Sequence, residues 1–262
     1  MHGFCLLWSC RSNLFFKVEF WKTGGAALRA LVAWPCAVHL YDAFGGGLKA
    51  YMLCLGVGET GLEQSMLLIV DLEATCWEMQ RAPNGDSQSI HNMEIIEVGC
   101  AVATRKGNLL NARSFLVRPT RNPVLSDFCM ELTGITQSMV DAAPTLPETI
   151  EAMNAWLGDL PDDFIWCSWG NYDRLHLEAQ SLLDGAQPAI LARPHLNLKR
   201  IWRRTTGQKR KNGFANALAF HGLDFEGHHH RGVDDARNMA RVLPYMDWSL
   251  EPELLTPPEV PV

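Results

Sequence analysis

The sequence predicts an α/β protein in which a mixed central β-sheet is flanked by helices. An unbroken apolar run at residues 66–70 is typical of a strand that is buried on both faces. Further strand-like segments follow it, and helical segments then alternate with strands in the second half of the chain. This order indicates one sheet with helices packed on it, and 262 residues suffice for one such domain with an appendage.

Apolar composition and spacing place the individual elements. Strands are expected at residues 66–70, 94–104, 114–117 and 164–169. Helices are expected at residues 125–132, 137–141, 146–157, 171–183, 196–204, 216–221 and 233–243. Thr145 stands directly before the third of these helices, where a hydroxyl can cap the first turn.

The two ends of the chain lack this pattern. Residues 1–65 hold four of the eight cysteines and carry a net charge of +1, whereas residues 66–262 carry −7. The only regular element expected there is a helical turn or two in residues 26–32. We therefore expect a functional domain at residues 66–246. The extension before it is expected to be poorly ordered or not made in the cell, and a small accessory or regulatory segment is the alternative.

Four prolines make residues 247–262 a loose, Pro-rich tail in this interpretation. The cysteines form no CxxC pair and no zinc-binding spacing, which is typical of free thiols in a reducing compartment. No uncharged apolar stretch reaches the length of a membrane span. A cytoplasmic protein without a membrane partner is therefore expected.

The overall charge argues against one class of nucleic-acid protein. The net charge is −6, whereas a protein that passively coats nucleic acid over a wide surface is usually basic. An enzyme can still hold a few nucleotides in an acidic cleft, because bound cations supply the positive charge there.

Four carboxylates and one histidine stand where predicted elements begin or end. Asp71 and Glu73 follow the first strand at positions i and i+2, so their side chains share one face about 7 Å apart. Asp173 opens a helix, and His230 and Asp235 bracket the start of the last helix. Carboxylates that lie close together repel one another unless cations neutralise them. Carboxylate oxygens are ligands that Mg²⁺ and Mn²⁺ bind readily. The set matches two-metal phosphodiester hydrolysis, with the histidine accepting the proton of the attacking water.

Each of these signals is weak alone. An Asp-x-Glu after a strand is more often a helix cap and a surface charge, and residues 228–230 could form a solvated loop or an adventitious metal binder. Their order and their strand and helix contexts together favour catalysis. The runs that carry this pattern are residues 69–78 (IVDLEATCWE), 94–99 (EIIEVG), 125–129 (LSDFC), 132–136 (LTGIT), 168–173 (SWGNYD), 196–199 (LNLK) and 230–235 (HRGVDD).

These runs resemble the DEDD exonucleases of the histidine subtype, especially the branch of histone-mRNA and enhanced-RNAi 3′ exonucleases with its bacterial relatives. The resemblance covers about residues 66–246. It implies an RNase H-like fold, two divalent cations, and hydrolysis of single-stranded nucleic acid, RNA rather than DNA, to 5′-mononucleotides. The metal ligands implied are Asp71, Glu73, Asp173 and Asp235. His230 is implied as the general base, and the family spacing selects Asp235 over Asp234.

Several residues are candidates for holding the substrate. The resemblance places Phe128 over the terminal base as a wedge or stacking platform, and Trp169 is a second candidate. Core packing is the alternative for both. The resemblance also implies backbone contacts to the terminal nucleotide from Ala74 and Thr75.

A basic segment stands out in the acidic domain. Residues 199–211 hold seven Lys and Arg residues, which indicates either an arm that follows the phosphates or a solvated helix face. The substrate-binding candidates in it are Arg203, Arg204, Arg210 and Lys211.

Two rival functions stay open at the level of sequence. One is a nucleic-acid-binding or regulatory module on an inactive nuclease fold, which the loss of a carboxylate would mark, yet all four are present. The other is an oligonucleotide phosphodiesterase with the same site. Choosing RNA over DNA requires a contact to the 2′-hydroxyl, which no sequence pattern reveals. The sequence indicates no protein partner.

Overall fold

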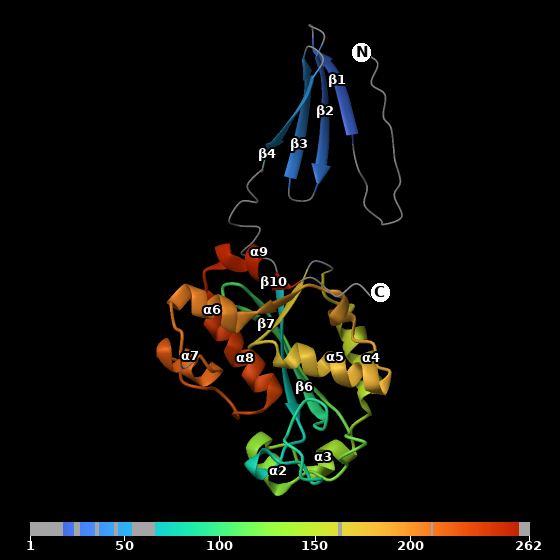
Figure 1. Ribbon diagram of the computed structural model, residues 1–262, viewed down its shortest axis with the longest axis vertical. Helices are drawn as coiled ribbons and strands as arrows, with labels where there is room; N and C mark the ends of the chain where they lie inside the picture. Colours follow the sequence, from blue (N-terminus) through green and yellow to red (C-terminus); the bar gives the residue numbers. More distant parts are fainter. Residues whose placement is uncertain are drawn as a thin grey trace. The chain divides into compact units, whose positions relative to one another are not determined.

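The computed structural model divides into two compact units, Met1–Leu62 and Glu63–Val262, and each is taken by itself. It describes strands within residues 18–53, and residues 66–256 apart from 162–163 and 211. The strands of the first unit form an antiparallel sheet in the order β1-β2-β3-β4 (Figure 1). Their bounds are β1 Val18–Thr23, β2 Ala27–Trp34, β3 Ala37–Phe44 and β4 Gly47–Leu53.

The helical turn predicted for residues 26–32 is wrong, because β2 occupies residues 27–32 and pairs with strands on both sides. Strand formation depends on such neighbours more than on local preference, so the short apolar segment gave no reliable signal.

The second unit contains the predicted mixed sheet. Its strand order is β10-β9-β8-β5-β6-β7, with β5 parallel to β8, β8 parallel to β9, and the other pairs antiparallel. The bounds are β5 Met66–Ala74, β6 Ile95–Thr104, β7 Leu109–Leu116, β8 Ile165–Ser168, β9 His195–Asn197 and β10 Leu255–Thr256. Strand β5 therefore lies inside the sheet, as its continuous apolar run predicts.

The predicted helices are present, with one correction. They are α2 Asp127–Thr133, α3 Gln137–Asp141, α4 Leu146–Leu157, α5 Tyr172–Asp184, α6 Leu198–Thr206, α7 Phe214–Phe220 and α8 Gly232–Val242. Thr145 caps α4 in a capping box with Glu148. The helix predicted at residues 196–204 begins later, because residues 195–197 form β9. In the part of the chain that the structure describes, no helix has the length and apolarity needed to cross a bilayer.

Alternate residues of β5 pack into two different cores. Leu67 and Ile69 belong to a cluster with residues of α6, α7 and α8, whereas Leu68 and Val70 pack with residues of α4 and α5. Figure 1 shows these two groups of helices on opposite sides of the sheet. Because side chains alternate along a strand, the odd-numbered residues that continue β5 face α8.

The end of the domain is packed rather than loose. After η4 Trp248–Leu250, α9 Glu251–Leu254 leads into β10, which pairs with β9. Leu254 is buried in the cluster that α8 covers. The prediction of a loose tail is therefore wrong for residues 247–256, because an apolar side chain and a buried ion pair fix this segment. Residues 257–262 lie outside the described residues.

The buried pair is Arg105 with Glu251. Nε and Nη2 of Arg105 each donate to a Glu251 carboxylate oxygen at 2.7 Å, and the side chains are 4% and 6% exposed. Removing one partner leaves a buried charge unpaired, so Arg105→Met should destabilise the protein by about 3–5 kcal/mol in urea unfolding. The double variant Arg105→Met/Glu251→Leu should recover much of that loss. A single change that costs under about 1 kcal/mol would show that the pair does not hold the segment.

Candidate active site

Three carboxylates converge at the end of β5. Asp71 and Glu73 project from the strand toward α8, and Asp235 comes from the first turn of α8. One carboxylate oxygen of each lies within 4.8 Å of the others. Glu73 and Asp235 are buried and Asp71 is half-buried. The oxygens are closer than the spacing of about 7 Å along a strand would place them, and one cation can contact all three.

Asp173 lies beside this cluster, in the first turn of α5. Its Oδ1 accepts a hydrogen bond from the amide of Leu72 at 3.2 Å, and its side chain is buried. Leu72 stands between the two strand carboxylates, so this bond fastens the start of α5 to the strand at the cluster. Asp173 is close enough to raise the pKa of Asp71 and that of Glu73 by repulsion.

Burial raises the pKa of all four carboxyl groups, and repulsion from neighbouring carboxylates adds to it for Asp71, Glu73 and Asp235. Burial is the larger cause for Asp71 and Glu73, whose pKa values lie well above the usual range. Burial also raises the pKa of Asp173 to about 6 and that of Asp235 to about 7, although hydrogen bonds to both partly oppose it. Buried acids that repel one another are stabilised by divalent cations, and this all-oxygen donor set fits such ions.

Two glycines let α8 approach the sheet closely. A Cβ atom on Gly99 of β6 would lie 1.9 Å from the carbonyl carbon of Gly232. A Cβ atom on Gly232 would lie 2.8 Å from the carbonyl oxygen of Asp71. The start of α8 therefore rests directly on the backbone of β5 and β6, which puts Asp235 beside the strand carboxylates.

Comparison with known proteins decides the family. Residues 68–243 match the RNase_T family model, which is described as Exonuclease. The chain belongs to the exonuclease family. Its relatives confirm the predicted branch, that of the histidine-subtype DEDD 3′-5′ exonucleases of the histone-mRNA and ERI1 kind, and family members of this type use divalent metal ions. The RNase H-like fold is confirmed as well.

Two relatives and one solved structure illustrate the match. The 3′-5′ exonuclease eri1 of Schizosaccharomyces pombe is 31% identical over 208 residues, which cover 69% of this chain and 67% of that protein. ERI1 exoribonuclease 3 of Homo sapiens is 30% identical over 187 residues, covering 67% and 52%. The exonuclease thus spans about half the length of this human relative. The crystal structure of the nuclease domain of 3′hExo, a DEDDh family member, bound to rAMP, superposes with a TM-score of 0.61 at 28% identity, covering 69% and 90%.

His230 of the exonuclease reaches the cluster through its backbone. Its φ is 61°, and its amide donates to Oδ2 of Asp235 at 2.8 Å. The residue as a whole is exposed, but the atoms packed around its ring and the neighbouring His229 and His228 disfavour the charged form and lower its pKa, so the ring is neutral near pH 7. The neighbouring His229 stacks on Phe225 and has Nδ1 4.0 Å from Oδ1 of Asp235. The ring of His229 thus borders the carboxylates, and the ring of His230 lies 5.8 Å from it, centroid to centroid.

Asp234 points away from the metal-ligand candidates. Its carboxylate pairs with Arg237 at 3.1 Å and accepts the amide of His228 at 3.0 Å. It therefore takes part in contacts on the outer side of the first turn of α8.

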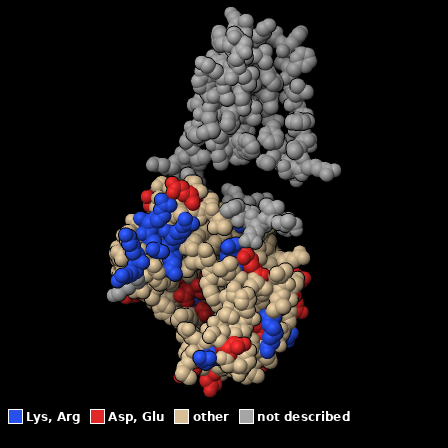
Figure 2. All heavy atoms as spheres, viewed as in Figure 1, with Lys and Arg blue, Asp and Glu red and all other residues tan. Residues whose placement is uncertain are grey.

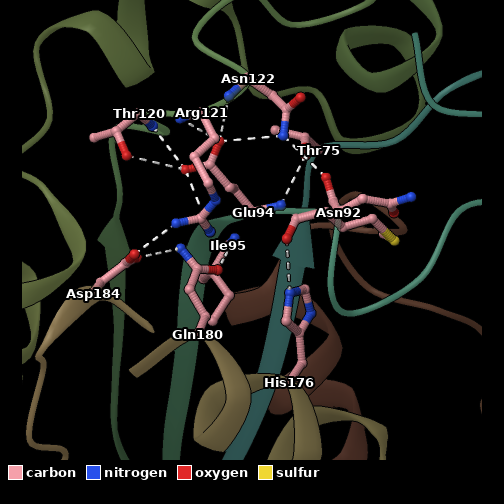
Figure 3. Close-up of polar contacts among 11 residues, drawn as sticks. Thr75, Asn92, Glu94, Ile95, Thr120, Arg121, Asn122, His176, Gln180 and Asp184 are labelled. Atoms are coloured by element: carbon pink, nitrogen blue, oxygen red, sulfur yellow. Dashed lines mark hydrogen bonds and ion pairs between the residues drawn. The ribbon is translucent and has the colours of Figure 1, made fainter. Parts of the chain in front are cut away.

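A buried network joins the end of β5 to β6 and α5 (Figure 3). The amide of Thr75 donates to the carbonyl oxygen of Glu94 at 2.7 Å, and the Thr75 hydroxyl accepts the Glu94 amide at 2.9 Å. Gln180 of α5 accepts the amide of Ile95 at 2.7 Å. The Glu94 carboxylate in turn accepts the amides of residues 120–122. The strand that carries the cluster is thereby fixed to its neighbours.

This network changes one expectation and adds residues that sequence reasoning missed. The Thr75 amide already donates to Glu94, so a nucleotide contact through that amide is not expected, whereas the contact at buried Ala74 stays a prediction. Glu94 stands within one of the motif runs. However, no pattern in the sequence around it indicates that its carboxylate accepts hydrogen bonds from the distant residues 120–122. Gln180 lies on an ordinary helical face and carried no signal at all.

The two aromatic candidates differ in their surroundings. Phe128 is 39% exposed on α2, and Ser126 before it donates its hydroxyl to the carbonyl oxygen of Cys76 at 2.6 Å, which ties the helix to the segment after β5. Trp169 instead packs against Trp202 and Phe214, and its indole N–H donates to a backbone carbonyl at 3.0 Å. Core packing therefore describes Trp169 better, and Phe128 keeps its candidacy as a stacking platform.

The basic candidates lie on and after α6. Arg203, Arg204 and Arg210 are exposed, and Lys211 lies outside the described residues. Arg204 pairs with Glu253 at 2.9 Å in a solvent-exposed contact. Figure 2 shows Lys and Arg side chains gathered over α6, beside a hollow in which acidic side chains gather.

Proposed function

We propose that this exonuclease removes nucleotides one at a time from the 3′ end of single-stranded nucleic acid, preferring RNA to DNA, and releases 5′-mononucleotides. The observation that carries the proposal is the convergence of Asp71, Glu73 and Asp235 within 4.8 Å, with Asp173 alongside. The names of the relatives support RNA, since several are called exoribonucleases and the similar nuclease domain was solved with rAMP.

The roles of the site residues follow from their chemistry. Asp71, Glu73, Asp173 and Asp235 would hold two divalent cations, Mg²⁺ or Mn²⁺, which lower the pKa of an attacking water and stabilise the leaving oxygen. His230, neutral near pH 7, would accept the proton of that water. Phe128 would stack on the terminal base and hold the end in place.

A digestion assay on the full chain tests the proposal. The substrates are 5′-labelled single-stranded RNA and DNA, each with Mg²⁺, Mn²⁺ or EDTA, and Asp71→Ala serves as the inactive variant. We expect a ladder of shortening products, faster on RNA, that vanishes with EDTA and with the variant. Folded, metal-bound protein that shortens neither substrate would point to a binding module. A rate on a dinucleotide above that on a 20-mer would point to an oligonucleotide phosphodiesterase.

The arginines over α6 give a separate prediction. Replacing Arg203, Arg204 and Arg210 by alanine should weaken binding of a 20-mer RNA, because exposed guanidinium groups attract phosphates and these three would contact them. The slope of log affinity against log salt should fall by about 1 for each phosphate that the variant no longer neutralises. The matched control replaces three exposed arginines on other parts of the domain, Arg113, Arg118 and Arg237, and should leave the slope unchanged. Equal slopes in both variants would rule out phosphate binding by the arginines over α6.

The exposed ring of Phe128 gives another testable prediction. Phe128→Ala should raise KM for single-stranded RNA about 10-fold or more, since stacking on one base contributes about 1–3 kcal/mol. Phe128→Trp should retain binding because it keeps an aromatic face. Steady-state kinetics with a 20-mer measure both, and a KM for Phe128→Ala equal to that of the unchanged protein would refute the stacking role.

We also propose that residues 66–256 contain the whole active unit, since residues 247–256 pack into the same domain, and that the protein works in the cytoplasm. The family match lies entirely within this range, and the described cysteines, Cys76, Cys100, Cys129 and Cys167, are free and buried, which suits a reducing compartment. Mass spectrometry of the native protein tests whether the segment before Met66 is made, and imaging of a tagged chain tests the location.

A further inference from the structure

A further acidic side chain, Glu97, is buried next to the carboxylate cluster. Glu97 lies on β6 directly opposite Glu73 on β5, and its exposed area is 0%. Its charge raises the pKa of Asp71, Glu73 and Asp235. A buried carboxylate without partners is costly, so the contacts of Glu97 decide what it does in this place.

The contacts of Glu97 show what compensates it. Its Oε2 accepts the amide of Gly232 at 3.0 Å, and Arg231 Nε lies 3.2 Å from the same oxygen. Arg231 Nη2 donates to Oε1 at 3.4 Å, and the hydroxyl of Ser114 donates to Oε1 as well. The carboxylate is thus neutralised by a guanidinium and by the positive end of α8. Both of its oxygens are used, which leaves it poorly placed to bind a cation.

The residues that contact the Glu97 carboxylate lie next to the candidate catalytic residues in the sequence. Arg231 follows His230, and Gly232 precedes Asp235 by three residues, within the same first turn of α8. Asp235 in turn accepts the His230 amide at 2.8 Å. A shift of the helix start would therefore move both side chains away from the strand carboxylates together.

We propose that Glu97 is a positioning residue that clamps the start of α8, through Gly232 and Arg231, and so sets the distance of Asp235 and His230 from Asp71 and Glu73. The inference rests on the proposed function for its catalytic consequence, but the clamp itself concerns cation binding. The close packing of Gly99 on Gly232 brings the helix to the sheet, and the Glu97 contacts fix its register there.

The test compares Glu97→Gln with Glu251→Gln in the full chain. Both residues are buried glutamates paired with an arginine, but Glu251 pairs with Arg105 and contributes nothing to the carboxylate cluster. Melting without metal, Mn²⁺ binding by calorimetry, and RNA digestion against Mg²⁺ concentration are measured for each. For Glu97→Gln we expect Mn²⁺ affinity and the half-saturating Mg²⁺ concentration to worsen about 10–100-fold, as for other residues that orient metal ligands. Glu251→Gln should lower the melting temperature and leave both metal readouts unchanged.

The outcomes separate the clamp from the proposed function. Mn²⁺ affinity of Glu97→Gln equal to that of the unchanged protein, or a loss matched by Glu251→Gln, overturns the inference. If Glu97→Gln does not fold, Arg231→Gln takes its place under the same criteria. If the unchanged protein binds Mn²⁺ but digests nothing, and Glu97→Gln still weakens that binding, the clamp stands while the proposed function fails.

Discussion

Asp235→Asn should abolish digestion of RNA and, at the same time, stabilise the metal-free protein. Loss of a cation ligand removes several kcal/mol of transition-state stabilisation. At tenfold per about 1.4 kcal/mol, we expect a fall of about 1,000-fold or more in kcat/KM. The amide keeps the shape of the side chain and still accepts the hydrogen bond from the His230 amide, but it carries no charge among the buried carboxylates.

The raised pKa of Asp235 determines how the stability gained by Asp235→Asn changes with pH. Burial raises the pKa of Asp235 from 3.8 to about 7, so between these values the folded protein holds a proton that the unfolded chain has released. The free energy of unfolding of the metal-free protein therefore falls as pH rises through this range. Asp173, with its pKa raised to about 6, acts in the same direction.

Below pH 6.5, two buried histidines make the free energy of unfolding rise with pH, which opposes the effect of the carboxyl groups. Burial lowers the pKa of His176 and that of His195 to about 4, so the unfolded chain binds more protons between pH 4 and 6.5. Their contribution to stability increases with pH there and is complete above pH 6.5. The clearest measurement is therefore urea unfolding in EDTA between pH 6.5 and about 8.

At about pH 8, Asp235→Asn should be more stable than the unchanged protein by up to about 4 kcal/mol, because the pKa of Asp235 is raised from 3.8 to about 7 and each unit corresponds to about 1.4 kcal/mol. Adding Mn²⁺ should reverse the order, because the unchanged protein gains stability from binding and the variant gains little. A variant that is destabilised without metal at this pH would contradict the view that the buried charge of Asp235 destabilises the metal-free protein.

Gly99→Ala should separate α8 from the sheet. The added methyl would lie 1.9 Å from the carbonyl carbon of Gly232 and 2.2 Å from the amide nitrogen of Val233. Both are backbone atoms, so no side chain can turn aside and the helix start has to move. We expect a loss of about 3 kcal/mol in the free energy of unfolding, the upper end of overpacking effects. Mn²⁺ binding should be lost with it, because Asp235 moves with the helix.

The matched control is Gly213→Ala. Gly213 caps α7 with ordinary backbone angles, and its added methyl would meet only the Asn216 side chain, at 3.6 Å. This variant should keep full Mn²⁺ binding and nearly full stability. Urea unfolding and calorimetry on both variants check the pair. Wild-type Mn²⁺ affinity in Gly99→Ala would show that the close approach of α8 is not needed to assemble the cluster.

The sequence by itself determined the elements and the order of the acidic residues. The apolar run of β5 predicted a strand inside the sheet, and helical spacing predicted α4, α5 and α8. The i, i+2 spacing also placed Asp71 and Glu73 on one face, because that relation is fixed by the geometry of a single strand. Local patterns of this kind depend only on residues a few positions apart.

The tertiary structure alone decided what those residues meet. Partners far along the chain decide that β9 precedes α6, that residues 247–256 dock through Arg105, and that Trp169 packs against the core. The same holds for Glu97. In the sequence it is one more charged residue in a strand, and only the structure shows that Gly232 and Arg231 pair with it. Burial and pairing set the energy of a charged group, and both arise only when distant segments come together.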